Sequence, residues 1–325
     1  MGVEQKFTVS VVVNAYNEEK NIGDCMSSLN KQSLKNFEVI FVDDGSTDRT
    51  VEIVKRFRNK LDLKMVLLSH AGHRKARRKG ISKATGDIVV IVDADEILEP
   101  GFLENIVEPF EKKEVGAVGG ILKSMGERWA NRAYGALQEM LYQLRKNGDG
   151  EIDWIQGGCS AYRRSLLTEV GGLSEDMVST DKDISWRIKD AGWKIILKEE
   201  AVAYHKDPSS LRSLAKREYK NGKKEYNLLK KHGKFGWKEL SRFYTLMGLM
   251  ALVIVPFFPL LLILILLGFL LTFMVTAYQI NKHVKDRHLG ISFTCWVVLT
   301  VINLGWSLGY IHSLLIRGDY EVENR

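Results

Sequence analysis

The chain contains 325 residues, 45% of them hydrophobic, and its 47 Lys and Arg against 40 Asp and Glu give a net charge of +7. Two stretches carry no Lys, Arg, Asp or Glu: the 38 residues from 243 to 280 and the 28 residues from 289 to 316. Because roughly 20 apolar residues cross the core of a bilayer, these stretches exclude a wholly soluble protein.

Four near-continuous apolar runs in the first hundred residues predict strands that are covered on both faces. Capping residues open the helical stretches between them: Asn17, the Ser46–Asp48 segment before Val51–Phe57, and Pro100 before Phe102–Phe110. This alternation predicts an α/β domain with a mostly parallel sheet, whose ligands bind beyond the carboxyl ends of the strands. The expected strands are Thr8–Asn14, Phe37–Val42, Lys64–Leu68 and Asp87–Val92.

Polar or acidic clusters follow three of these strands, at residues 14–18, 43–46 and 93–95. A single cluster can be a helix cap or a solvated loop, but carboxylates gathered at one edge repel each other unless a cation joins them. Asp93 and Asp95 are two apart where a strand ends, so their side chains share a face. Hard oxygen ligands of this kind predict Mg²⁺ or Mn²⁺ with positions left for a substrate diphosphate.

The middle of the chain contains two further features. The glycine pair Gly157-Gly158 suits backbone that approaches a substrate closely. Asp181 and Asp183 precede a predicted helix over Ile184–Ala191, and one of them is expected to cap it. A carboxylate at the mouth of the cleft would alternatively serve as a general base.

Together these segments, in this order, resemble family 2 of the inverting glycosyltransferases, which have the Rossmann-like GT-A fold. The resemblance covers residues 8 to about 205. The segments that carry it are SVVVNAYNEE (10–19), VDDGSTD (42–48), ATGDIVVIVDADE (84–96), GGCSAYRR (157–164) and TDKDISWRI (180–188).

The resemblance implies a role for each matching position, and it implies a nucleoside-diphosphate sugar, UDP- or GDP-linked, as the donor. Asp181 would be the base that deprotonates the acceptor hydroxyl. The residues implied for the nucleotide sugar are Ala15, Tyr16, Glu18, Asp44, Asp93 and Ala94. Those implied for the metal are Asp95, Asp93 and His205, and those on the acceptor side are Gly157, Gly158 and Trp186.

The sequence departs from the family pattern at two positions. Asn14 stands where the family usually has Pro, which leaves the path of the first loop open. Thr180 replaces the usual Glu before the base, a change that alters acceptor contacts without removing the base.

A basic segment precedes the apolar stretches. Residues 206–242 hold twelve Lys and Arg against four Asp and Glu, a net charge of +8, whose natural partners are anionic lipid headgroups or lipid phosphates. Leu211, Ala215, Tyr219, Gly222, Tyr226 and Leu229 recur at helical spacing and predict an amphipathic helix in the membrane interface. The alternative is a charged helix docked on the enzyme domain. The residues expected at a lipid phosphate are Arg212, Lys216, Arg217 and Lys220.

The domain boundaries follow from these patterns: a catalytic domain over 1–210, an interfacial region over 211–242, a membrane region over 243–316 and a tail over 317–325. The membrane region is expected to contain three segments, about 243–257, 259–280 and 289–316, because 38 apolar residues would form a helix of about 57 Å. The alternative is one long tilted helix followed by 289–316.

The start of the chain and its basic loops predict the location. Met1–Thr8 lacks the apolar core of a signal peptide, and the three cysteines have no metal-binding spacing. The basic linker at 282–287 would lie on the cytoplasmic side. We therefore expect a multi-pass protein of the cell membrane whose catalytic domain faces the cytoplasm.

The expected function is transfer of a hexose-type sugar to a hydroxyl of a lipid-linked or membrane-associated acceptor. One alternative is a polyprenyl-phosphate glycosyltransferase, and a second is an inactive GT-A domain that serves as a membrane adaptor. A processive polysaccharide synthase is disfavoured because the Q-x-x-R-W signature of those enzymes is missing. Nucleic-acid binding is not expected, since no base-reading or stacking elements are present.

Overall fold

The protein is described here from a computed structural model, which covers residues 6–126, 128–173, 180–207, 210–233, 243, 246–247, 259–284 and 289–315. The chain divides into two compact units. The first, the sheet unit, comprises Met1–Lys123 and Arg145–Lys206. The second, the helical unit, comprises Ser124–Leu144 and Asp207–Glu323. Ser124–Leu144 thus groups with the C-terminal helices. The predicted end of the catalytic domain at 210 stays a prediction.

The sheet unit contains one eight-stranded sheet in the order β3-β2-β1-β4-β7-β6-β8-β5. β1 pairs in parallel with β2 and β4, and β2 pairs in parallel with β3, which confirms the predicted parallel half. β7 runs antiparallel to both β4 and β6, and β5 runs antiparallel to β8. The strands are β1 Val9–Ala15, β2 Phe37–Asp43, β3 Asp62–Leu67, β4 Ile88–Asp93, β5 Glu96–Leu98, β6 Val115–Ser124, β7 Ser160–Arg163 and β8 Lys194–His205.

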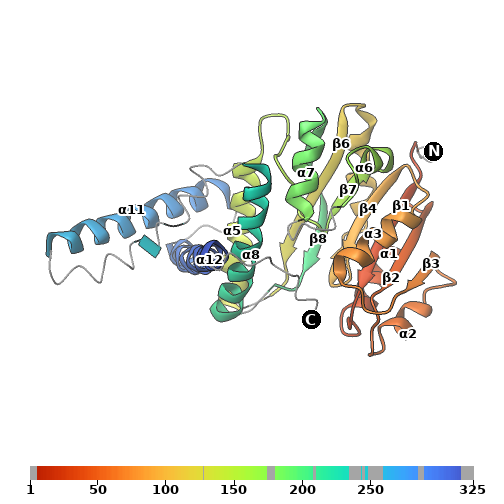
Figure 1. Ribbon diagram of the computed structural model, residues 1–325, viewed down its shortest axis with the longest axis horizontal. Helices are drawn as coiled ribbons and strands as arrows, with labels where there is room; N and C mark the ends of the chain where they lie inside the picture. Colours follow the sequence, from red (N-terminus) through yellow and green to blue (C-terminus); the bar gives the residue numbers. More distant parts are fainter. Residues whose placement is uncertain are drawn as a thin grey trace. The chain divides into compact units, whose positions relative to one another are not determined.

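Helices cover both faces of this sheet (Figure 1). The side chains of α1 and α4 share a buried apolar core with alternate residues of β1, β2 and β4. On the other face α3 lies so close that a Cβ at Gly80 would meet Val12 Cγ1 at 2.4 Å. The helices are α1 Ile22–Asn30, α2 Thr50–Lys55, α3 His73–Lys83, α4 Phe102–Val107, α6 Arg164–Glu169 and α7 Thr180–Asp190, with a 3-10 turn η1 at Glu108–Glu111.

Two predicted helix starts were wrong. Asn17 does not open a helix: it has a φ of 55°, its Oδ1 accepts a hydrogen bond from Thr47 N at 2.8 Å, and α1 begins only at Ile22. The helix expected from residue 184 begins at Thr180, so Asp181 and Asp183 lie in its first turn. Asp183 is buried there and accepts a hydrogen bond from Arg187 Nε at 3.0 Å, one helical turn later.

The strand register brings the predicted polar clusters together. In the sheet Ala15 lies beside Asp43, and Asn14 lies beside Asp93. β1, β2 and β4 therefore end level with one another, as expected for parallel strands. The prediction that three strands deliver polar groups to one edge of the sheet is confirmed.

The helical unit is built from α5 Trp129–Arg145, α8 Leu211–His232, α11 Pro259–His283 and α12 Leu289–Leu315. Side chains from all four helices form its apolar core, including Leu137, Leu214, Ile280 and Val298. Among the described residues, two segments are long and apolar enough to cross a membrane, Ile263–His283 and Gly290–Leu315. The third predicted span, 243–257, lies almost entirely outside the described residues, so the choice between two and three segments stays a prediction.

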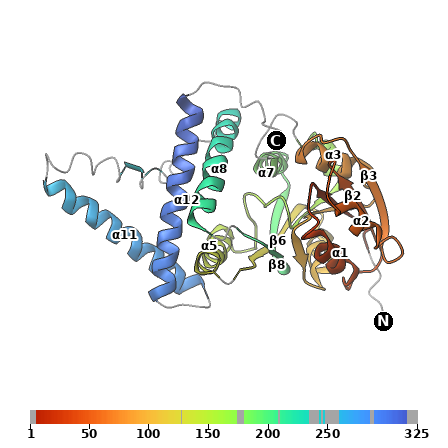
Figure 2. The same cartoon turned by 90° about the horizontal axis from the view of Figure 1, so that it is seen from below.

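α8 has defined ends and a partner for its apolar stripe. Ser210 caps it by accepting a hydrogen bond from Ser213 N at 3.2 Å, and Gly233 ends it with a φ of 62°. α8 and α12 lie side by side (Figure 2), and a Cβ at Gly222 would meet Trp306 O at 1.9 Å. The stripe is therefore covered by α12, and an interfacial location of α8 would depend on its basic face alone.

Candidate active site

The site is built around the end of β4. Asp93 is the last residue of this strand, the buried Ala94 follows, and Asp95 lies in the short connection before β5. Because β1 and β2 end at the same level, the loops that carry Tyr16, Glu18 and Asp44 start from the same edge. The residues predicted to bind the nucleotide therefore follow strands that end at the same edge of the sheet.

Arg77 of α3 joins two carboxylates that the sequence assigned to different roles. Its Nη2 donates to Asp93 Oδ1 at 2.7 Å, and its Nη1 donates to Asp181 Oδ1 at 3.3 Å. His73, one turn earlier, places its Nε2 at 3.6 Å from the same Asp93 oxygen. The Arg77 side chain is 4% exposed, whereas those of Asp93 and Asp181 are 31% and 34% exposed.

The electrostatics of this cluster favour the ionised form of Asp93. Burial by itself would raise the pKa of Asp93, but the positive charge of Arg77 and the neighbouring His73 outweigh it and hold that pKa below its ordinary value. Burial likewise opposes the charged form of Arg77, and the two carboxylates more than compensate, so its pKa is raised.

The glycine pair lies against these carboxylates. A Cβ at Gly157 would meet Asp181 Oδ1 at 2.4 Å and Arg77 Nη1 at 2.6 Å. A Cβ at Gly158 would meet Glu96 Oε1 at 1.9 Å and Asp93 Oδ2 at 2.9 Å. A side chain at either position would therefore displace these carboxylates, because the backbone is in contact with them at this point.

The metal prediction can be tested against the groups around Asp95. Asp95 Oδ2 lies 3.0 Å from His205 Nε2, and the two side chains are 29% and 23% exposed. A carboxylate oxygen and an imidazole nitrogen suit a divalent first-row ion, and the exposure leaves room for substrate oxygens. No group of three or more His, Cys, Asp or Glu around one ion is found in the described part of the chain. The residues therefore fit a two-ligand site at Asp95 and His205, whereas Asp93 Oδ1 is directed to Arg77.

Glu96 is a buried carboxyl group that the sequence analysis did not single out, and it lies beside Asp93. It is 1% exposed, and burial together with the charges of Asp93 and Asp95 raises its pKa well above the ordinary value. Its Oε2 accepts from Asp93 N at 3.1 Å, and its Oε1 has no hydrogen-bond partner among the described residues. Sequence patterns did not distinguish Glu96 from the Asp-x-Asp segment that it follows.

The predicted nucleotide side contains a rigid loop contact. The Asp44 carboxylate is buried and accepts hydrogen bonds from the backbone N–H groups of Ala71 at 2.6 Å and Gly72 at 2.9 Å. Tyr16 is exposed, and its ring centroid lies 4.3 Å from that of His70. Glu18 Oε2 accepts a hydrogen bond from Asn21 Nδ2 at 2.7 Å, and partial burial raises the pKa of the Glu18 carboxyl. Tyr16 and His70 offer the exposed aromatic surface of this edge.

Other predicted residues occupy different places. Trp186 lies on α7, five positions after Asp181. Arg212, Lys216 and Lys220 are exposed on α8, in the helical unit. Arg217 is half-buried there, with its Nη1 3.0 Å from Asp207 Oδ1 and its guanidinium over the Tyr134 ring. Its charge is thus partly satisfied within the helical unit.

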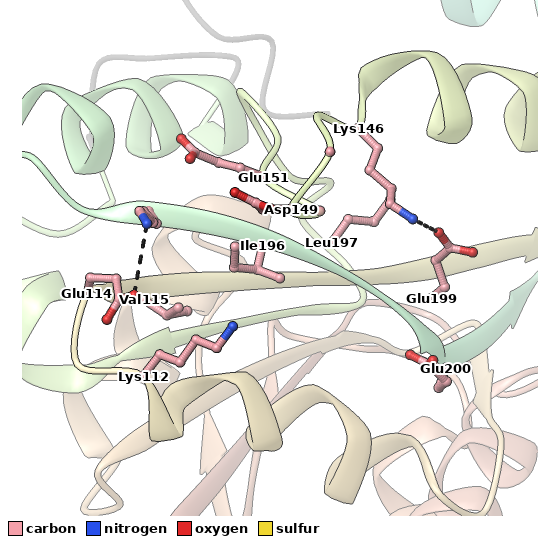
Figure 3. A pocket seen from close by; sticks show the side chains of 13 residues that line it. Lys112, Glu114, Val115, Lys146, Asp149, Glu151, Ile196, Leu197, Glu199 and Glu200 are labelled. Atoms are coloured by element: carbon pink, nitrogen blue, oxygen red, sulfur yellow. Dashed lines mark hydrogen bonds and ion pairs between the residues drawn. The ribbon is translucent and has the colours of Figure 1, made fainter.

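A separate cavity of about 510 Å³ lies at the other end of the sheet, near the starts of β6 and β8 (Figure 3). Its walls carry charges of both signs that pair with each other, as Lys146 Nζ does with Glu199 Oε1 at 2.5 Å. The cavity lies away from the carboxyl edge and holds none of the predicted site residues. It is therefore not the candidate active site.

Comparisons with known proteins assign most of the sheet unit to a family. The sequence profile of glycosyl transferase family 2 matches residues 10–171. These residues form a glycosyltransferase family 2 domain. The match includes the ends of β1, β2 and β4 and the glycine pair, but it stops before Asp181, so the roles of individual residues in this domain stay predictions.

Curated relatives and solved structures support the same assignment. The chain is 27% identical over 219 residues to a poly-beta-1,6-N-acetyl-D-glucosamine synthase of Staphylococcus epidermidis, which covers 64% of this chain and 52% of that protein. A synthase of the same name from Staphylococcus aureus is 26% identical over 227 residues, covering 66% and 54%. The chain thus spans about half the length of the curated relatives that it matches.

The solved structures confirm the fold. A mannosyltransferase of Pyrobaculum calidifontis, solved with GDP-Man and Mn²⁺, superposes with a TM-score of 0.66 at 20% identity and covers 97% of this chain and 89% of that one. S. aureus TarS 1-349, solved with UDP-GlcNAc, gives a TM-score of 0.52 at 24% identity and covers 66% and 64%. The glycosyltransferase domain therefore has the GT-A-like α/β fold that the sequence predicted.

Proposed function

We propose that the chain is a membrane-bound inverting glycosyltransferase that moves a hexose-type sugar from a nucleoside-diphosphate sugar to a hydroxyl of a lipid-linked or membrane-associated acceptor. One observation carries the proposal: Arg77 binds Asp93 and Asp181 together at the carboxyl edge, where the glycosyltransferase domain also places Asp95 beside His205. The residues proposed for the nucleotide sugar and for the base are thus adjacent in one cluster.

The residues of this cluster suit a single displacement. Asp181 would accept the proton of the acceptor hydroxyl while the new bond forms at the anomeric carbon and the nucleoside diphosphate leaves with the bonding electrons. Gly157 and Gly158 let the backbone lie directly against these carboxylates, where the acceptor would be bound. Asp95 and His205 would hold Mg²⁺ or Mn²⁺, which supplies charge neutralisation for the departing diphosphate.

The donor proposed first is UDP-linked N-acetylglucosamine. The support is the activity that the curated relatives are named for, since they are poly-beta-1,6-N-acetyl-D-glucosamine synthases. GDP-linked mannose is the second donor to examine, since a structure of similar fold contains GDP-Man. Tyr16 and His70 would lie against the nucleoside.

The acceptor follows from the need for a base. A hydroxyl has a pKa far above 7 and needs a proton acceptor in the transition state, whereas a polyprenyl phosphate is already an anion. Asp181 would be this proton acceptor, and its contact with Arg77 holds it in the cluster. This favours a hydroxyl acceptor over the polyprenyl-phosphate alternative. Exposed Arg212, Lys216 and Lys220 on α8 would bind the phosphate of a lipid-linked acceptor, and Arg217 would do so less readily because it is already ion-paired.

The membrane assignment is supported by two helices that are long and apolar enough to span a bilayer. We place the protein in the cell membrane with its glycosyltransferase domain on the cytoplasmic side, where nucleotide sugars are made. The basic residues of the linker after α11 favour this orientation.

The test is transfer by the full-length protein in detergent, with UDP-GlcNAc or GDP-mannose, Mn²⁺ and membrane lipid extract, followed by mass spectrometry of the lipid products. Asp181→Asn should lower the transfer rate by about 10²-fold or more while the donor still binds. Asp149→Asn, an exposed aspartate of the other cavity, is the control and should transfer normally. A polyprenyl-phosphate sugar whose formation survives Asp181→Asn would favour the alternative enzyme, and a folded protein that binds neither donor would favour the inactive adaptor.

A further inference from the structure

Arg77 differs from the other basic residues of α3. The helix has the sequence HRKARRKGISK and contains no acidic residue in its first turn. Lys75, Lys79 and Lys83 are exposed, whereas Arg77 is 3% exposed and lies on the same side as Ala76 and Gly80, which face the sheet. Burying a guanidinium costs several kcal/mol unless carboxylates and hydrogen bonds compensate it. The groups that the buried Arg77 guanidinium contacts must therefore account for its burial.

The packing of α3 directs Arg77 to the carboxyl edge of the sheet. Gly80 allows the helix to approach β1 and β2, because a Cβ there would meet Val12 at 2.4 Å and Val42 at 3.0 Å. Arg77 lies one turn nearer the start of α3 than Gly80, and so nearer the ends of the parallel strands. The helix thus delivers the guanidinium to the level of Asp93 without exposing it.

The two arms of the guanidinium reach carboxylates from separate parts of the chain. Nη2 binds Asp93 at the end of β4, and Nη1 binds Asp181 in the first turn of α7. The fork is planar and rigid, so it fixes the distance and the orientation between its two partners in a way that a lysine cannot. Tyr162 is buried and close enough to both Arg77 and Asp181 for their charges to act on its pKa.

The surroundings hold this bridge in one geometry. The backbone at Gly157 lies against both members of the Arg77–Asp181 pair, so that a Cβ would meet Asp181 Oδ2 at 2.5 Å and Arg77 Nη1 at 2.6 Å. Arg77 Nε has no hydrogen-bond partner among the described residues. The side chain is therefore held through its two terminal nitrogens, by the two carboxylates and by His73 Nε2, which lies 3.3 Å from Nη2.

We propose that Arg77 is a positioning residue that connects the donor side of the site to the base: by binding Asp93 and Asp181 at once, it sets Asp181 at a fixed place relative to the nucleotide sugar. This inference rests on the proposed function, because it assigns Asp181 as the base and Asp93 to the donor side. Arg77 acts through these carboxylates. It controls the rate of transfer more than the affinity for the donor.

The first experiment compares full-length Arg77→Lys with wild type in detergent, by donor binding and by steady-state transfer kinetics with UDP-GlcNAc and GDP-mannose. Lysine keeps the charge but cannot bridge two carboxylates, and a misplacement of about 1 Å can cost about 10²-fold in rate. We expect kcat to fall by about 10²-fold while the Kd and KM for the donor stay within about threefold. Lys79→Gln, which removes a charge from the exposed face of the same helix, should leave both unchanged.

A double-mutant cycle distinguishes positioning from a general structural role. Arg77→Lys should cost little, within about threefold, in a background that already carries Asp181→Asn, because the residue that it positions has lost its function. Equal losses in the two backgrounds would overturn the proposal. So would an Arg77→Lys protein that transfers at nearly the wild-type rate, or one whose donor binding falls in parallel with its kcat.

Gly157→Ala is the second variant and covers the case in which Arg77→Lys does not fold. Its added methyl separates Asp181 from Arg77 while both residues remain, so transfer should fall and donor binding should persist. Gly148→Ala is the matched control, because a Cβ at that position meets nothing within 4 Å. Transfer by Gly157→Ala at the wild-type rate would contradict the proposal.

The bridge can also be measured without any substrate. If the wild-type protein bound no nucleotide and transferred no sugar, the proposed function would fail, but the unfolding temperatures of the same variants would still report on the bridge. Arg77→Lys and Asp181→Asn together should lower the unfolding temperature by less than the sum of their separate effects. Additive effects would show that Arg77 does not hold Asp181.

Discussion

Glu38 in β2 shows how a single charged residue stabilises the sheet unit away from the active site. It is 7% exposed and accepts hydrogen bonds from Thr85 N at 2.8 Å and Ser10 Oγ, and it pairs with Lys64 Nζ at 2.5 Å. Burial would raise the pKa of this carboxyl, but these partners outweigh burial and lower it to about 2. The ionised form therefore stabilises the folded state.

The pH dependence of unfolding should report this group. A carboxyl whose pKa is lower in the folded state contributes stability that is complete above the unfolded value of about 4.5 and is lost as the pH falls toward 2. Glu38→Gln should reduce the free energy of unfolding at pH 7 by about 1–3 kcal/mol. It should also flatten the fall in unfolding temperature between pH 5 and pH 3. An equally steep fall in the variant would contradict the assignment.

At the scale of elements, the contact between α8 and α12 depends on glycines that admit backbone from the partner helix. A Cβ at Gly309 would meet Tyr219 O at 1.9 Å, and one at Gly222 would meet Trp306 O at the same distance. Aromatic side chains fill the adjacent space, where the rings of Tyr226 and Tyr310 meet edge to face with centroids 5.3 Å apart. The sequence predicted the apolar stripe on α8 but not that α12 covers it. Glycine within a helix usually lowers helix stability, so neither glycine indicated a helix contact in the sequence.

Alanine at these glycines should separate the two helices. Gly222→Ala should lower the free energy of unfolding by about 1–3 kcal/mol, because overpacking forces the backbones apart. Gly268→Ala on α11 is the control, since a Cβ there meets nothing within 4 Å. It should be neutral or slightly stabilising, by up to about 1 kcal/mol, from helix propensity. Equal effects of the two substitutions on the unfolding temperature would contradict close packing at Gly222.

At the scale of the whole molecule, the chain passes from the sheet unit to the helical unit and back before its final helices. α5 provides Ala133 and Leu137 to the core of the helical unit, and Cys295 Sγ of α12 lies 3.4 Å from Ala133 O. A cut after the sheet unit therefore leaves α5 without the helices that cover its apolar face.

A fragment of residues 1–206 should for this reason aggregate in plain buffer and become monodisperse only in detergent. Size-exclusion chromatography with light scattering would measure this. The control is a fragment of 1–206 that also carries Leu137→Glu and Met140→Glu, which should remain soluble. A monodisperse, detergent-free 1–206 fragment would contradict the assignment of α5 to the helical unit.

How far the sequence predicts the molecule differs between its two halves. β1, β2 and β4 were found because buried parallel strands read as continuous apolar runs. β3 was also found, but the expectation that it is covered on both faces was wrong, because it is an edge strand without a buried residue. The remaining strands were missed, since β6 contains three glycines within VGAVGGILKS and β8 carries charges within KIILKEEAVAYH. The parallel half therefore follows from local composition, whereas the antiparallel half depends on pairings between distant segments.

The site was predicted in the same uneven way. The acidic residues at strand ends and the glycine pair are visible in the sequence, and the structure places them at one edge. Arg77 and His73 were missed because they belong to a basic helical run, which is typical of a solvated surface. The only signal was the inward spacing of Ala76, Arg77 and Gly80, and its meaning depends on which face of α3 the sheet covers.

Binding of nucleotide at the carboxyl edge is the most direct test of the central claim. Thermal stability of the full-length protein would be measured with UDP and with GDP, each in the presence of Mn²⁺ and of EDTA, for wild type, Asp95→Asn and the control Asp149→Asn. We predict that one nucleotide raises the unfolding temperature only with Mn²⁺, and that Asp95→Asn abolishes this rise while Asp149→Asn preserves it. A well-folded wild type that neither nucleotide stabilises, or a rise that persists in Asp95→Asn, would contradict the account.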